Sequence, residues 1–165
     1  MSSNPENKNE STELLQLVSF KIANEEFGID ILNVQEINKM TQVTKVPNSP
    51  EFVEGVINLR GRVIPVVNLR VKMDLPNREY DKDTRIIVVD LSGKTVGFLV
   101  DSVSEVLRIP RNIMEPPPSI VAGINSNYIT AVGKLEDRLL ILLDLDKILH
   151  QDEKEVLETV NWLSK

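Results

Sequence analysis

The segment Asn58-Leu59-Arg60-Gly61-Arg62-Val63-Ile64-Pro65-Val66-Val67-Asn68-Leu69 occurs twice in this chain in similar form. The second copy is Lys134-Leu135-Glu136-Asp137-Arg138-Leu139-Leu140-Ile141-Leu142-Leu143-Asp144-Leu145. The shift is constant, since 134 − 58 = 76 and 145 − 69 = 76. In both copies a polar break precedes an apolar run, and an Asn or Asp follows that can accept a hydrogen bond from an unpaired helix N–H. Each copy therefore predicts a turn, a buried strand and a short helix.

The duplication extends upstream of this segment. The sequence GIDILNVQEI at 28–37 aligns without a gap to GFLVDSVSEV at 97–106, with a shift of 97 − 28 = 69. The second half is thus longer by 76 − 69 = 7 residues, which the proline-rich segment at 115–118 can accommodate. Each half should contain about five short strands and one short helix. Roughly 70 residues of this kind usually curl into a small barrel or sandwich.

The sequence therefore predicts an all-β fold made of two like barrels, packed face to face with a groove between them. The polar, turn-rich stretch PNREYDKD at 76–83 is the expected boundary. We expect the first barrel to span about 14–82 and the second about 83–150.

The two ends of the chain differ from the repeats. Residues 1–13 are polar and predict a disordered leader. Residues 151–165 place Val156, Leu157, Val160 and Leu163 on one helical face, which predicts an amphipathic C-terminal helix. We expect Trp162, the single tryptophan, to pack that helix against the rest of the protein.

Composition excludes several kinds of partner. The net charge of −6 disfavours binding to phosphate backbones, so we expect no nucleic-acid partner. The chain has no cysteine, which excludes disulfides and thiolate metal sites. No stretch approaches the roughly 20 apolar residues that a membrane span needs. We therefore expect a cytoplasmic protein with no direct membrane insertion.

The sequence also offers little catalytic chemistry. It contains one histidine, His150, and no metalloprotease, P-loop, dinucleotide-binding or nucleophile-elbow motif. Asp30 and Asp101 could form an acid pair, but aspartates at strand ends usually cap turns. Asp144 and Asp146 are too few ligands for calcium. We expect no enzyme activity, no cofactor and no metal site; the competing interpretation is a barrel that binds a small ligand.

Arg60 is the first candidate for a binding residue. Arg60-Gly61 stands where the second repeat has Glu136-Asp137, so the first half carries a cation where the second carries anions. An arginine beside a glycine at a strand end is presented outward and can bind a carboxylate through two hydrogen bonds. Spacing alone leaves two interpretations equally open, a surface arginine of little energetic value and an interface anchor.

Glu36 is the nearest candidate partner for Arg60. Our hypothesis is that the two side chains hold each other in place at a binding surface. Ile31 and Val34 lie just before Glu36. They belong to the core if the segment is a buried strand, and they are exposed apolar anchors if it is a loop.

These residues carry a family resemblance. The segments FGIDILNVQEI (27–37), VTKVP (43–47), VEGVINLRGRVIPVVNLR (53–70) and VGFLVDSVSEVL (96–107) together resemble the CheW family, the coupling proteins of bacterial chemotaxis. The resemblance runs from about Leu14 to about Leu149 and covers most of the chain. It implies two SH3-like five-stranded β-barrels around a shared core, with short helices.

The resemblance also implies a function. The family is a non-enzymatic adapter that bridges the cytoplasmic tip of methyl-accepting chemotaxis receptors to the regulatory domain of the histidine kinase CheA. Such a protein is cytoplasmic and is recruited to membrane receptor arrays. The same surfaces would also suit an adapter in a chemotaxis-like pathway that does not control swimming.

The family's functional positions map onto this sequence residue by residue. The receptor-binding arginine of NLRG is Arg60, the acid of VQEI is Glu36, and the apolar positions of the same element are Ile31 and Val34. We expect kinase contact on the first barrel, at Met40, Val43 and Val46. Arg62 stands where many relatives carry a small or apolar residue, so the resemblance assigns it no role.

Overall fold

The computed structural model describes residues 13–118, 127–149 and 153. The first half forms five strands, a 3-10 turn and a short helix: β1 (Leu14–Ile22), β2 (Glu25–Asp30), η1 (Ile31–Asn33), β3 (Val34–Lys39), β4 (Val53–Leu59), β5 (Arg62–Asn68) and α2 (Leu69–Lys72). The predicted leader lies outside the described residues except for Glu13, and the predicted C-terminal helix lies outside except for Glu153. His150 and Trp162 also lie outside them.

The second half repeats this order of elements. It contains β6 (Arg85–Leu91), β7 (Lys94–Val100), β8 (Ser102–Pro110), η2 (Arg111–Ile113), β9 (Met114–Glu115), β10 (Ile129–Lys134), β11 (Leu139–Leu143) and α3 (Leu145–Ile148). Helix α3 begins and ends 76 residues after α2, as the sequence repeat predicts. Irregularities in strand register also recur, since the shift between Val53 and Gly55 returns between Ile129 and Ala131.

The predicted helix caps are confirmed. The side-chain oxygen of Asn68 accepts hydrogen bonds from the backbone N–H groups of Arg70 (3.0 Å) and Val71 (3.3 Å). Asp144 accepts one from the N–H of Asp146 (3.0 Å) at the start of α3. These bonds satisfy helix N–H groups that have no partner within the helix, and so they stop each buried strand and start the helix that follows.

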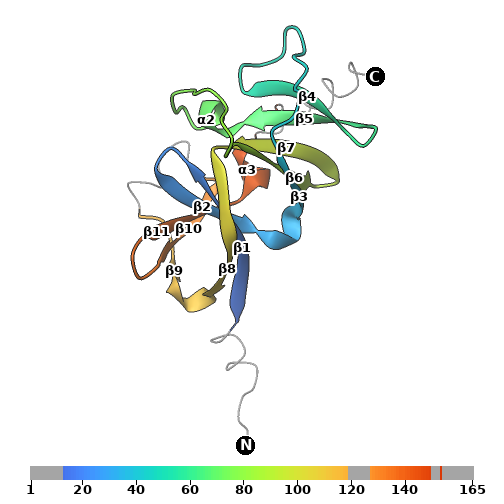
Figure 1. The fold of residues 1–165 in the computed structure, drawn as a ribbon. Coiled ribbons are helices and arrows are strands. Elements are labelled where there is room, and N and C mark those ends of the chain that lie inside the picture. The colour runs from blue at the N-terminus through green and yellow to red at the C-terminus, as the bar shows by residue number, and fades with distance from the viewer. Residues whose placement is uncertain (1–12, 119–126, 150–152, 154–165) are drawn as a thin grey trace, which may run out of the picture.

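The strands form two sheets, and each sheet contains strands from both halves of the chain (Figure 1). Sheet I has the order β8-β1-β2-β11-β10-β9, and sheet II has the order β3-β6-β7-β5-β4. The first hairpin, β1–β2, therefore pairs with strands of the second half, and the hairpin β6–β7 pairs with strands of the first. In Figure 1 the blue β1–β2 lies among yellow and orange strands in the lower part of the molecule.

This exchange of hairpins corrects the expected division into barrels at 14–82 and 83–150. Parallel pairing of β2 with β11 and of β7 with β5 joins each hairpin to the opposite half. The all-β fold with an internal duplication is confirmed, but each sheet is built from two parts that are distant in sequence. Neither half contains a complete sheet.

The core explains why the hairpin strands are apolar on both faces. In β6, Ile86 and Val88 pack into a cluster within sheet II, while Ile87 and Val89 enter a large cluster shared by both sheets. The shared cluster takes residues from both hairpins, from β4, β5 and β11, and from both helices. A smaller third cluster around Leu140 lies within sheet I. The two sheets therefore enclose one common core, and burial of this apolar surface is the main stabilising term.

Two polar contacts hold the exchanged hairpins in place. Asp101 accepts a hydrogen bond from the N–H of Ala23 in the β1–β2 turn (2.8 Å) and pairs with Arg70 of α2. At the corresponding place in the second half, Ser92 of the β6–β7 turn donates to Asp146 of α3 (3.3 Å). The turn of each hairpin is thus tied to the helix of its own half, although the strands of the hairpin pair with strands of the other half.

The segment at 40–46 alternates loosely in sequence but forms no strand. It makes a single bridge, in which Thr44 and Val56 exchange two backbone hydrogen bonds of 2.8 Å. The segment lies close against Gly55, where a Cβ would stand 2.3 Å from the carbonyl oxygen of Thr44. The absence of a side chain at Gly55 therefore permits this close approach of two backbone segments.

Candidate protein-binding surface

Arg60 lies in a two-residue turn between β4 and β5. Its φ is +53° and that of Gly61 is +87°, the conformation of a type I′ hairpin turn. The side chain of Asn58 accepts a hydrogen bond from the N–H of Gly61 (2.8 Å) and fixes the turn. The Arg60 side chain is 70% exposed, so the turn presents a guanidinium to solvent, as the sequence predicts.

Glu36 is the partner of Arg60, which confirms the predicted pairing. Nη1 of Arg60 donates to Oε1 of Glu36 (3.0 Å), and Nη2 donates to Oε2. This hydrogen bonding is the main reason that the pKa of Glu36 lies below its ordinary value; burial acts in the opposite direction but is outweighed. The same contact raises the pKa of Arg60. Both side chains therefore stay ionised and hold each other in a fixed orientation.

Glu36 reaches Arg60 because of an irregularity in β3. The register against β6 shifts between Val34 and Glu36, where Val34 pairs with Val89 and Glu36 with Val88. The extra residue is Gln35, so β3 carries a bulge that re-aims the side chains that follow it. The second half has the same irregularity in β8, opposite Ser19 and Phe20. The bulge therefore belongs to the repeated fold.

The apolar residues next to Glu36 divide between core and surface. Ile31 and Val34 are half-buried and pack against the shared core cluster. Each is therefore partly a core residue and partly an exposed apolar residue, the two alternatives that the sequence left open. Leu32, between them, is 87% exposed. Asp30 caps η1 by accepting a hydrogen bond from the N–H of Leu32 (2.9 Å), which turns that side chain outward. The sequence prediction did not include Leu32, for which the capping residue Asp30 was the available signal.

These side chains lie along η1, β3 and the β4–β5 turn. We call this set the Arg60 surface and define it as Ile31, Leu32, Val34, Glu36 and Arg60. It combines a very exposed leucine with a pre-oriented ion pair. An exposed large apolar side chain is a feature of protein-interaction surfaces, and arginine is enriched at the residues that dominate binding energy there.

The three residues expected to contact the kinase lie together on the segment that follows β3. All three are half-buried. Met40 and Val43 pack against the core cluster of sheet II, and Val46 packs against the shared cluster. Each therefore contributes to the core with part of its surface and presents the remainder to solvent.

The aspartates considered as acids have structural partners. Asp30 caps η1, and Asp101 pairs with Arg70 through Nε (2.8 Å) and Nη2 (2.6 Å). Burial opposes ionisation of Asp101, but bonds from Arg70 and Ala23 outweigh it and lower its pKa. Within the described ranges, no group of three or more His, Cys, Asp or Glu side chains could hold a metal ion. No helix among those residues is long and apolar enough to cross a membrane.

Comparisons with known proteins agree on one family. The family model described as a CheW-like domain matches residues 16–153. The chemotaxis protein CheW of Klebsiella aerogenes is 40% identical over 145 residues, covering 88% of this chain and 87% of the relative. CheW of Helicobacter pylori is 39% identical over 143 residues, covering 87% of this chain and 86% of the relative.

A solved structure shows the same fold. The crystal structure of the scaffolding protein TtCheW from Thermoanaerobacter tengcongensis superposes with a TM-score of 0.79 at 39% sequence identity. The match covers 86% of this chain and 97% of that chain.

Proposed function

The chain belongs to the CheW-like family, and from this premise we propose that it is a non-enzymatic adapter that couples methyl-accepting chemotaxis receptors to the histidine kinase CheA. Receptor state would then control kinase autophosphorylation through this protein. The observation that carries the proposal is the ion pair between Arg60, exposed on a tight turn, and Glu36 of β3, the strand that follows the exposed Leu32 of η1.

We propose the Arg60 surface as the receptor-binding site. An exposed ion pair adds little to fold stability, because water and salt screen it. A doubly bonded arginine on a rigid turn is nevertheless well suited to recognition, since its side chain loses little freedom on binding. Leu32 would supply apolar area that becomes buried in the complex, with Ile31 and Val34 supporting it from the core.

We propose that the kinase contacts a different part of the molecule, at Met40, Val43 and Val46. Their half-buried side chains sit on a segment that the Thr44–Val56 bridge holds in place. A partner would cover the exposed portion of an apolar cluster that is already ordered, so little conformational entropy would be lost on binding.

Two separate binding sites on one rigid body explain how such an adapter would work. The shared core and the Asp101–Arg70 pair fix the two sheets relative to each other. The distance and angle between receptor and kinase are then fixed as well. Many copies in a receptor array would give high avidity from contacts that are individually modest. We propose that the protein acts in the cytoplasm and reaches the membrane through its receptors.

Binding to each partner separately tests this function. The protein would be titrated with a soluble receptor signalling fragment and, independently, with the regulatory domain of CheA. We expect Arg60→Glu to abolish receptor binding while retaining kinase binding, and Met40→Lys to do the reverse. Arg111→Glu is the matched control, because Arg111 also forms an exposed ion pair, with Glu13 (3.1 Å), away from both sites. A wild-type protein that binds neither partner would refute the proposal.

A further inference from the structure

The duplication places two arginines at equivalent positions. Arg62 opens β5, and Arg138 stands 76 residues later, just before β11. The surroundings of the two can be compared residue by residue, because the halves share their topology. The carboxylates around one arginine therefore show which partners the other arginine has or lacks.

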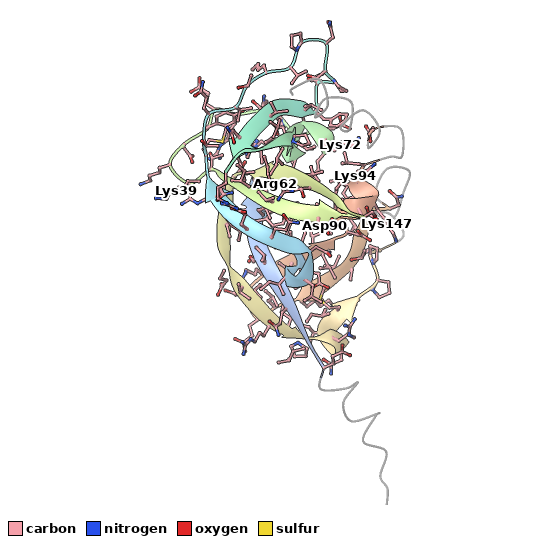
Figure 2. The ribbon with its side chains drawn as sticks, turned by 90° about the vertical axis from the view of Figure 1, so that its right-hand side faces the viewer. Lys39, Arg62, Lys72, Asp90, Lys94 and Lys147 are labelled. Atoms are coloured by element: carbon pink, nitrogen blue, oxygen red, sulfur yellow. The ribbon has the colours of Figure 1, made fainter. Side chains whose placement is uncertain are left out.

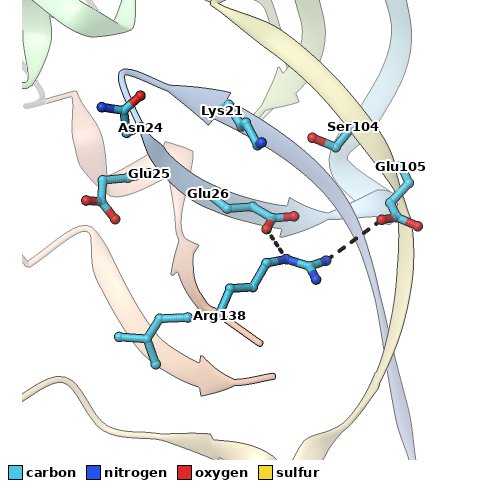
Figure 3. Close-up of a pocket in the computed structure, with 8 residues that line it drawn as sticks. Lys21, Asn24, Glu25, Glu26, Ser104, Glu105 and Arg138 are labelled. Atoms are coloured by element: carbon cyan, nitrogen blue, oxygen red, sulfur yellow. Dashed lines mark hydrogen bonds and ion pairs between the residues drawn. The ribbon is translucent and has the colours of Figure 1, made fainter. Parts of the chain in front are cut away.

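Arg138 is surrounded by carboxylates from its own chain (Figure 3). Its Nε donates to Glu26 (2.5 Å), its Nη1 donates to Asp137 (2.8 Å), and its Nη2 lies 3.8 Å from Glu105. Glu26 is 6% exposed and also accepts a hydrogen bond from the buried Ser19. The positive charge of Arg138 is therefore neutralised within the fold.

Among the described residues, Arg62 makes none of the three equivalent ion pairs. The residue equivalent to Glu26 is Thr95 (26 + 69), and the residue equivalent to Asp137 is Gly61 (137 − 76). The residue equivalent to Glu105 is Glu36 (105 − 69), but both of its oxygens accept hydrogen bonds from Arg60. Thr95 can accept a hydrogen bond but carries no charge to balance the guanidinium.

The remaining contacts of Arg62 are correspondingly few. Among the described residues its side chain makes one hydrogen bond, from Nη2 to Oγ1 of Thr95 (2.9 Å), and no ion pair within 4 Å. Arg62 pairs with Leu59 across the β4–β5 turn that holds Arg60, and its charge helps to lower the pKa of Glu36. Arg62 is exposed, and Figure 2 shows it on the face of the molecule turned toward the viewer.

Two guanidiniums, those of Arg60 and Arg62, thus belong to the same β4–β5 turn, and Glu36 hydrogen-bonds to that of Arg60. A guanidinium has five N–H donors in a planar fork that matches a carboxylate. Arg62 is held by Thr95 through one nitrogen, which leaves most of that fork pointing to solvent. A docking protein that brings an acidic side chain here would restore the arrangement that Arg138 has within the fold.

We infer that Arg62 is a specificity-determining residue of the Arg60 surface, and that its ligand is a carboxylate of an Asp or Glu on the bound receptor segment. The inference rests on the proposed receptor-binding function and adds the chemistry of the partner to it. Receptor segments with an Asp or Glu opposite Arg62 bind favourably, and segments with a Lys or Arg at that position are disfavoured by charge repulsion.

Two substitutions test the inference by different routes. Arg62→Gln removes the charge but keeps hydrogen-bonding capacity, and Thr95→Glu places beside Arg62 the carboxylate that Arg138 has in Glu26. We expect each to weaken binding of a soluble receptor signalling fragment about tenfold, as loss of one interfacial charge pair does. Arg62→Lys retains the charge and should lose less. Melting temperatures of all three should stay near that of the wild type.

Salt dependence and charge reversal complete the test. Wild-type affinity should fall as ionic strength rises, and Arg62→Gln and Thr95→Glu should both show a shallower fall. Arg62→Glu should bind the unchanged receptor fragment weakly. In a set of fragments that each carry one acidic residue changed to Lys, one fragment should restore binding to Arg62→Glu. If Arg62→Gln and Thr95→Glu bind the fragment as tightly as the wild type with the same salt dependence, the inference is overturned while the receptor-binding function stands. If the wild type does not bind the fragment, the function itself fails and the inference fails with it.

Discussion

Arg70 and Asp101 form a doubly bonded ion pair that joins helix α2 to the connection between β7 and β8, with N–O distances of 2.8 and 2.6 Å. The two side chains are 12% and 11% exposed. Asp101 also receives the N–H of Ala23 from the first hairpin. One carboxylate therefore connects helix α2, the β1–β2 turn of sheet I and the end of β7 in sheet II, which are far apart in the sequence.

This pair predicts a pH dependence of stability. Because the pKa of Asp101 is lower in the folded protein, its ionisation stabilises the fold above the ordinary aspartate pKa of about 4, and this stabilisation is lost as pH falls below it. Asp101→Asn should lower the free energy of unfolding by about 2 kcal/mol at pH 7, since it leaves Arg70 without its counter-charge. Urea unfolding at pH 7 and near pH 3 measures both effects. If the wild type and the variant differ equally at both pH values, ionisation of Asp101 does not contribute to stability as predicted.

Exchange of the hairpins predicts how fragments behave. Residues 14–82 carry β1–β2 but lack β8 and β11, with which that hairpin pairs. We expect the fragments 14–82 and 83–149 to be unfolded when separate and to form β structure when mixed, because each then receives the hairpin it lacks. Circular dichroism of the separate and mixed fragments checks this. A folded, monomeric 14–82 fragment would contradict the exchange.

Gly55 predicts a link between packing and kinase binding. Gly55→Ala brings a methyl group to within 2.3 Å of the Thr44 carbonyl oxygen and 2.7 Å of Val43, so the segment at 40–46 must move. We expect a loss of about 2 kcal/mol in unfolding free energy and weaker binding of the CheA regulatory domain, with receptor binding unchanged. Gly93→Asn, at a turn with φ +89° and open space, is the control. Unchanged kinase binding in a destabilised Gly55→Ala protein would argue against the kinase site.

The turn conformation of Arg60 separates its stability role from its binding role. A non-glycine residue at φ +53° is strained, so Arg60→Gly should leave the melting temperature equal or slightly higher. The same change removes the guanidinium and should abolish receptor binding. Differential scanning calorimetry and titration with the receptor fragment measure the two effects. A clear fall in melting temperature would show that the ion pair stabilises the fold, against its high exposure.

Local structure could be predicted from sequence where one residue type satisfies a specific need. Asn68 and Asp144 end a buried strand and cap a helix, as predicted. The exchange of hairpins could not be predicted in this way. Alternation of apolar residues shows which face of a strand is buried, but it carries no information about which strand pairs with which.

The candidate site shows the same limit. The pairing of Arg60 with Glu36 could be predicted because Arg60 differs from its counterpart Glu136 in the second repeat and Glu36 is the nearest candidate carboxylate. Arg138 has a buried carboxylate partner, and Arg62 has none within the part of the chain that the structure describes. That partner is Glu26, which comes from the exchanged hairpin and lies 112 residues from Arg138 in the sequence. That contact becomes visible only once the pairing of β2 with β11 is known.

The most direct measurement is a combined co-sedimentation and kinase assay. Receptor-containing membranes, CheA and this protein would be sedimented together, and kinase autophosphorylation would be read in the same samples for the wild type, Arg60→Glu and Arg111→Glu. The coupling function predicts that the wild type and Arg111→Glu carry CheA into the pellet and raise its activity, while folded Arg60→Glu does neither. The function is contradicted if CheA sediments and is activated equally with Arg60→Glu, or if the wild type leaves it in the supernatant.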